Sequence, residues 1–78
     1  MKLDIISPER TIYSGDAELV TLPGINGSFT ILDKHAPIIS ILVKGKVSYR
    51  ESGKDNEMEI NGGFVELKNN VITVCVEE

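Results

Sequence analysis

Apolar residues along this chain alternate with polar ones at a period of two, in short runs that Gly, Pro, Asn and Ser interrupt. This alternation is typical of β-strands with one buried face, and no segment carries the apolar stripe of an amphipathic helix. The pattern predicts an all-β protein of about nine or ten short strands joined by tight turns. The expected strands are Lys2–Ile6, Arg10–Tyr13, Ala17–Leu22, Ser28–Leu32, Ile38–Leu42, Lys46–Glu51, Glu57–Ile60, Phe64–Lys68 and Val71–Val76.

The end of the chain indicates how these strands are arranged. Asn69-Asn70 separates two expected strands, and because Asn tolerates positive φ values, this pair predicts a two-residue hairpin. Residues 71–76 are apolar on both faces, so we expect this strand at the centre of a sheet. So many short antiparallel strands must stack as two sheets or close on themselves, which predicts a β-sandwich or a flattened barrel.

Composition narrows the class of protein. The chain has 78 residues, enough for one small domain, and its 41% hydrophobic content indicates a folded domain rather than a disordered segment. Only 5% of the residues are aromatic, so the core should be aliphatic, with Phe29 and Phe64 filling much of it. A formal net charge of −4 with no basic cluster argues against binding to nucleic acid.

The cysteine count and the lengths of the apolar runs indicate in which cellular compartment the protein works. Cys75 is the only cysteine, so no intrachain disulfide can form, and the first ten residues lack the apolar run of a signal peptide. We therefore expect an intracellular, reducing compartment. The apolar runs are far shorter than the ~20 residues that cross a bilayer, so we expect no direct membrane insertion.

Candidate chemistry is sparse. A metal site needs about four ligands, and this chain offers one His and one Cys, so a structural zinc is not expected. Cys75 lies in the most apolar expected strand, where a thiol loses reactivity, so we interpret it as a core residue rather than a nucleophile with His35 as its base. No catalytic residue and no cofactor is expected.

Asp33-Lys34 is the strongest competing signal. Small acidic carrier domains of the lipoyl type present a modified lysine in an Asp-Lys-Ala hairpin tip. Here His35 takes the Ala position and Pro37 follows, where that hairpin needs a strand that donates backbone hydrogen bonds. A lipoyl or biotinyl carrier with Lys34 as the modified residue remains the alternative hypothesis.

One long segment carries a family resemblance. Residues 22–47, LPGINGSFTILDKHAPIISILVKGKV, resemble the signature of the epsilon subunit of F-type ATP synthases, where a Pro-Gly-x-x-Gly-x-Phe turn leads through a short strand into His-Ala-Pro. LDIISPERTIYSGDAELVTLPG is similar to the opening strands of that family, NGGFVEL to its Ser-Gly-Gly-Phe-x-Glu stretch and KNNVITVCVEE to its closing hairpin. The resemblance covers nearly the whole chain.

This resemblance implies one domain over residues 1–78, a sandwich of two five-stranded sheets. It implies a non-catalytic rotor subunit that packs on the gamma subunit, rests on the polar loops of the membrane c-ring and couples proton flow to ATP synthesis, at the cytoplasmic face of the bacterial inner membrane. Carried over by position, Ser28 lies where the family's turn faces the c-ring. Ser7, His35 and Ser40 lie where the family approaches gamma or the edge of the ring.

The chain departs from the family pattern at two places. The family usually has Pro-Gly before its His-Ala-Pro, where this chain has Asp33-Lys34, so a rigid turn becomes a charged one. Family members also commonly continue into a two-helix hairpin that can inhibit ATP hydrolysis, whereas the sequence ends at Glu78. We therefore expect no C-terminal helical domain and no inhibition by that route.

Overall fold

The computed structural model describes all 78 residues and contains nine β-strands. No helix in it is long and apolar enough to cross a membrane. Every expected strand is present, although the ends of most are shifted by a few residues. The strands are β1 (Lys2–Ile6), β2 (Thr11–Asp16), β3 (Leu19–Gly24), β4 (Gly27–Leu32), β5 (Ile38–Leu42), β6 (Gly45–Glu51), β7 (Lys54–Ile60), β8 (Gly62–Lys68) and β9 (Val71–Glu77).

Strand β7 shows the clearest shift. It begins at Lys54 rather than at Glu57, because the turn that precedes it consists only of Ser52 and Gly53, both with positive φ. A tight two-residue turn of this kind lets pairing with β6 continue as far as Glu51 opposite Lys54. The expected hairpin at Asn69-Asn70 is confirmed, since both residues have positive φ and Lys68 pairs with Val71.

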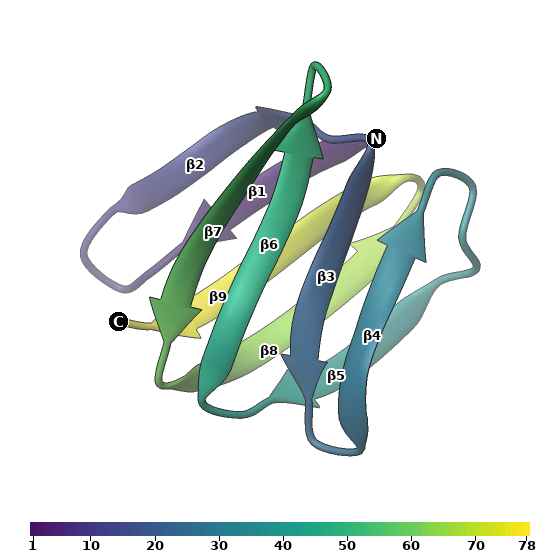
Figure 1. Cartoon of the computed structure of the whole chain (residues 1–78). Helices are drawn as coiled ribbons and strands as arrows, with labels where there is room; N and C mark the ends of the chain where they lie inside the picture. Colours follow the sequence, from purple (N-terminus) through teal and green to yellow (C-terminus); the bar gives the residue numbers. More distant parts are fainter.

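The strands form two layers that face each other (Figure 1). One layer has the order β2-β1-β9-β8-β5, and the other has the order β4-β3-β6-β7. A single pairing between Gly24 of β3 and Leu42 of β5 joins the layers at one corner, so one curled sheet runs through the whole molecule. The predicted sandwich or flattened barrel is confirmed, with four strands in the second layer where the resemblance implied five.

Strand β9 lies at the centre of the larger layer, as its two apolar faces predicted. It pairs in parallel with β1 on one side and antiparallel with β8 on the other. The side chains that point between the layers form one aliphatic core, and burying each large one typically stabilises the fold by about 1.5–3 kcal/mol. The core residues are Leu3, Ile5, Ala17, Val20, Leu22, Ile31, Leu42, Val47, Ile60, Val65, Leu67, Ile72, Val74 and Val76.

Two expectations about the core are wrong. Phe29 packs against the core as expected, but Phe64 is exposed. The reason is the alternation along β8, where Val65 and Leu67 point inward and leave Phe64 on the outer face. Cys75 is half-buried on the same outer face, opposite Phe64, and is not a core residue.

Candidate docking surface

The structure does not gather the four residues carried over from the family into one patch. Ser7 follows β1, Ser28 lies in β4, His35 lies in the loop between β4 and β5, and Ser40 lies in β5. Ser28 and His35 lie toward opposite ends of β5, because the β3–β4 hairpin meets β5 at Leu42 and the loop enters it at Ile38. Ser40 pairs with a buried residue of β8, so its side chain points toward the inside of the sandwich.

A row of apolar side chains crosses the outer face of the five-stranded layer. Ile6 pairs with Cys75, Cys75 with Phe64 and Phe64 with Ile41, and residues that pair across strands point to the same face of a sheet. We call these four residues the apolar row. Ile41 is 60% exposed and Phe64 is 49% exposed, and Ile39, two residues along β5, is 76% exposed. This face therefore offers large apolar side chains to solvent.

The β3–β4 hairpin extends this surface. The backbone N–H of Ile25 donates to the carbonyl oxygen of Ile41 at 3.1 Å, and the N–H of Val43 donates to the carbonyl oxygen of Pro23 at 2.9 Å. These bonds hold the hairpin tip against the end of β5. Ile25 is 59% exposed and Val43 is 39% exposed. The apolar surface thus continues from the row to the hairpin that carries Ser28.

Three residues of the row, Ile6, Cys75 and Phe64, line a groove of about 340 Å³. Ser7, Pro8 and Glu77 also line this groove. Burial raises the pKa of the Cys75 thiol, and the negative charge of Glu66 raises it further, so this thiol stays protonated at neutral pH. Cys75 thus contributes a small apolar contact to the groove rather than a nucleophile.

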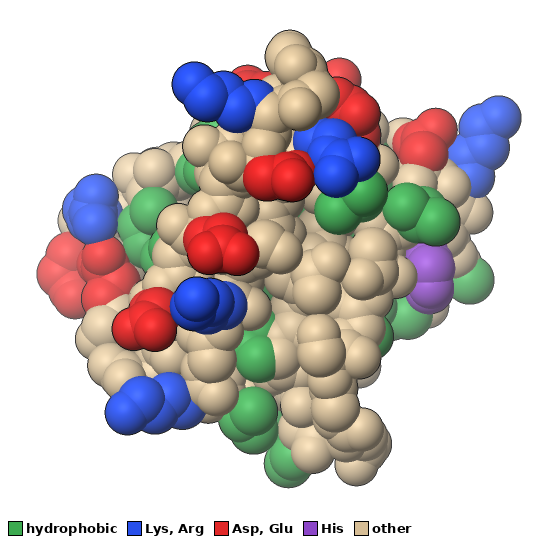
Figure 2. All heavy atoms as spheres, viewed as in Figure 1, with side chains coloured by type: hydrophobic (Ala, Val, Ile, Leu, Met, Phe, Trp, Pro, Cys, Tyr) green, Lys and Arg blue, Asp and Glu red, His purple; other side chains and the backbone are tan.

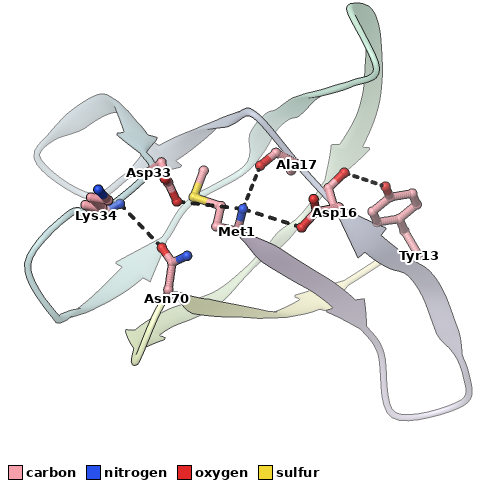
Figure 3. Close-up of polar contacts among 7 residues, drawn as sticks. All are labelled: Met1, Tyr13, Asp16, Ala17, Asp33, Lys34 and Asn70. Atoms are coloured by element: carbon pink, nitrogen blue, oxygen red, sulfur yellow. Dashed lines mark hydrogen bonds and ion pairs between the residues drawn. The ribbon is translucent and has the colours of Figure 1, made fainter.

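The loop of residues 33–37 is fixed by backbone and side-chain bonds (Figure 3). The N–H of Lys34 donates to Oδ1 of Asn70 at 3.4 Å, and the N–H of His35 donates to the carbonyl oxygen of Leu32 at 3.2 Å. The Nδ1 atom of the His35 ring lies 2.8 Å from the carbonyl oxygen of Ala36. Lys34 has a φ of 63°, a left-handed conformation that glycine adopts more easily.

The Met1 α-ammonium group joins this loop to the turn between β2 and β3 (Figure 3). It lies 3.8 Å from a carboxylate oxygen of Asp33 and 3.4 Å from one of Asp16, and it donates a hydrogen bond to the carbonyl oxygen of Ala17.

The position of Lys34 in the fold does not match the carrier hypothesis. The loop with Lys34 joins β4 to β5, which pair with other strands and not with each other, so Lys34 is not at a hairpin tip.

The outer face of the four-stranded layer has a different character. In Figure 2, acidic and basic side chains gather over β6 and β7, while β3 and β4 present few charges. The guanidinium of Arg50 donates to the carboxylate of Asp55 at 2.8 Å and holds the pKa of that carboxyl group below its usual value. Thr21 and Thr30 share a hydrogen bond between their hydroxyl oxygens at 2.8 Å. This face is polar, so the two outer faces differ sharply.

Sequence reasoning missed the apolar row. The sequence IISILV is apolar at odd and even positions alike. Because consecutive residues of a strand point to opposite faces, some of these apolar side chains had to point away from the core. A further signal was present in β8, where Phe64 shares its face with Glu66 and Lys68. Those two charged residues mark the outer face of that strand.

Comparison with known proteins gives a consistent result. The family model described as the ATP synthase delta/epsilon chain β-sandwich domain matches residues 1–78. An ATP synthase epsilon chain of Lawsonia intracellularis is 42% identical over 77 residues, covering 99% of this chain and 58% of that protein. One from Desulfitobacterium hafniense is 40% identical over 75 residues, covering 96% of this chain and 57% of that protein. The chain thus spans less than two thirds of the length of these curated relatives.

Solved structures share the fold. A chain in the cryo-EM structure of the central stalk and c-ring of the Tetrahymena thermophila mitochondrial ATP synthase superposes with a TM-score of 0.85, covering 99% of this chain and 63% of that one, at 17% identity. A chain in the Euglena gracilis mitochondrial ATP synthase superposes with a TM-score of 0.91, covering 97% of this chain and 49% of that one, at 22% identity.

Proposed function

Because this chain belongs to the ATP synthase delta/epsilon β-sandwich family, we propose that it serves as a non-catalytic subunit in the rotor of a proton-translocating F-type ATP synthase. In this role it docks on the gamma subunit and on the polar loops of the c-ring, and so couples proton flow to ATP synthesis. It works at the cytoplasmic face of a bacterial inner membrane, held there by the complex. The bacterial epsilon chains it resembles support this proposal.

The apolar row is the observation that carries the proposal. Monomeric proteins rarely leave several large apolar side chains exposed together, and such patches mark surfaces that bind a partner. Here Ile39, Ile41 and Phe64 are exposed on two neighbouring strands that are hydrogen-bonded to each other, rather than on a loop. A rigid face of this kind loses little conformational freedom on binding and can transmit force, as a rotor contact requires.

The four residues carried over from the family take different parts in this proposal. Ser7 lines the groove together with three residues of the apolar row and is proposed to contact gamma. Ser28, next to the β3–β4 hairpin tip, is proposed to face the c-ring. The imidazole of His35, in the loop of residues 33–37, is proposed to face gamma or the edge of the c-ring. Ser40 lies between Ile39 and Ile41 in β5 with its side chain on the opposite face, so it is proposed to act through the strand that presents these two side chains.

Binding to the cognate gamma subunit tests this function. We compare wild-type protein with Ile41→Glu, which places a carboxylate in the apolar row, and with Thr30→Glu, which places one on an exposed strand position of the other layer. Burying one isoleucine contributes about 1.5–3 kcal/mol, so Ile41→Glu should weaken binding at least tenfold. Thr30→Glu should bind as wild type does, and thermal unfolding checks that both variants are folded.

The possible outcomes test separately whether the protein binds gamma and whether the apolar row makes that contact. Wild-type protein that does not bind gamma would refute the proposed function. Wild-type protein that binds gamma, with Ile41→Glu binding equally well, would show that the role is correct and that another face makes the contact.

A further inference from the structure

We propose that Asn70 is a positioning residue that holds the loop of residues 33–37 in the conformation that docks on the rotor. Its contact with the loop follows from the structure of this chain alone, whereas its effect on docking rests on the proposed function. Asn70 lies in the turn between β8 and β9, 36 residues along the chain from the Lys34 amide that it binds.

The backbone of Asn70 is anchored firmly. Its carbonyl oxygen accepts a hydrogen bond from the N–H of Lys2 in β1 at 3.2 Å, and the turn joins two strands that pair along their length. The φ of Asn70 is 61°, a value that asparagine tolerates better than most residues. The turn therefore aims the amide side chain from a fixed base on the five-stranded layer.

The loop needs such support at Lys34. Its φ of 63° is a conformation that an L-residue keeps only when its surroundings hold it. The other hydrogen bonds of this segment are local, from His35 to Leu32 and between the His35 ring and Ala36. Local bonds fix the shape of a loop but not its orientation on the protein, and the ion pair between the Met1 α-ammonium and Asp33 at 3.8 Å holds only the first residue of the loop. The Asn70 side chain supplies a bond from the five-stranded layer to the loop backbone (Figure 3).

Asn69 provides a matched control. It occupies the same turn with a φ of 53°, so glycine at either position keeps the turn geometry without strain. Of these two asparagines, only Asn70 accepts a hydrogen bond from the loop. Asn70→Gly therefore removes the contact, Asn69→Gly changes the turn equally without removing it, and Asn70→Asp keeps an oxygen that can accept from the Lys34 amide.

The first measurement is hydrogen exchange at the Lys34 amide, followed by NMR on the full chain without a partner. A hydrogen bond of this kind should slow exchange by about two- to tenfold. Asn70→Gly should lose that protection, while Asn69→Gly and Asn70→Asp should keep it. Unchanged protection in Asn70→Gly, or an equal loss in Asn69→Gly, would overturn the proposed contact.

The second measurement is affinity for the gamma subunit and c-ring complex. Asn70→Gly should bind severalfold more weakly than Asn69→Gly, and Asn70→Asp should restore binding. Faster exchange at Lys34 with unchanged affinity would overturn the docking part of the inference. Wild-type protein that fails to bind would instead count against the proposed function, and the exchange result would still decide whether Asn70 positions the loop.

Discussion

The paired glycines at the start of β8 give the sharpest test of the fold. Gly62 and Gly63 have φ values of 152° and 146°, a region that side-chain-bearing residues rarely enter. A Cβ atom on Gly63 would overlap the backbone carbonyl oxygen of Cys75 and lie 3.0 Å from the Cα of Val76. A Cβ atom on Gly62 would meet nothing closer than the carbonyl oxygen of Leu42 at 3.6 Å. Alanine should therefore be far more damaging at Gly63 than at its neighbour.

The expected loss in free energy of unfolding has two contributions. Both alanine variants face the backbone conformation, which costs about 1–3 kcal/mol. Gly63→Ala must also move β8 away from β9 at the centre of the layer, and overpacking of this kind adds about 1–3 kcal/mol or more. A domain has about 5–15 kcal/mol of total stability, and one this small is expected near the low end. Gly63→Ala should leave the protein barely stable or unfolded, while Gly62→Ala should remain folded.

Equilibrium unfolding in urea, followed by far-ultraviolet circular dichroism, measures both variants. The midpoint should fall in the order wild type, Gly62→Ala, Gly63→Ala. The two variants should differ in free energy of unfolding by at least about 1 kcal/mol. Equal midpoints would show that β9 moves aside at little cost and that the close approach at Cys75 does not constrain the sequence.

Three further predictions concern single side chains. Phe64→Ala should cost only about 1–2.5 kcal/mol in free energy of unfolding, since half of the residue is exposed, and a larger loss in urea unfolding would contradict its outward position. Lys34→Gly should stabilise the protein by about 0.5–1 kcal/mol in the same assay, because glycine adopts a φ of 63° freely. The pKa of Tyr13 is raised to about 12 by burial, with a further contribution from Glu51, so its stabilising effect is complete below pH ~10 and is lost as the pH rises toward 12. Glu51→Gln should move the ultraviolet titration of Tyr13 to lower pH, and an unchanged titration would exclude Glu51 as a cause.

The sequence by itself determined the local structure. Alternation at a period of two located all nine strands, and residues that tolerate positive φ located the hairpin at Asn69-Asn70. These features depend on neighbouring residues, so a single sequence is enough to predict them. The strand over residues 71–77 was also placed correctly at the centre of a layer, although β5, whose residues are likewise apolar on both faces, lies at the corner of the layer and exposes one of them.

The family signature likewise contained a structural fact. The resemblance places glycine where this chain has Lys34, and the positive φ of that residue explains why glycine suits the position. The Gly62-Gly63 pair is explained in the same way, by backbone conformation and by the close approach of β9 at Gly63. In both cases the sequence showed that the residues mattered, and the structure supplied the reason.

Tertiary structure alone decided which apolar side chains are exposed. A period of two shows that a strand has two faces but not which one is inside, so Ile39, Ile41 and Phe64 could be placed outside only once the strands were paired. The parallel pairing of β1 with β9 and the corner between β3 and β5 join residues distant in the chain. The contact between Lys34 and Asn70 is of the same kind. Such contacts are set by which distant strands pair and by how the layers stack, which the local pattern of a sequence does not encode.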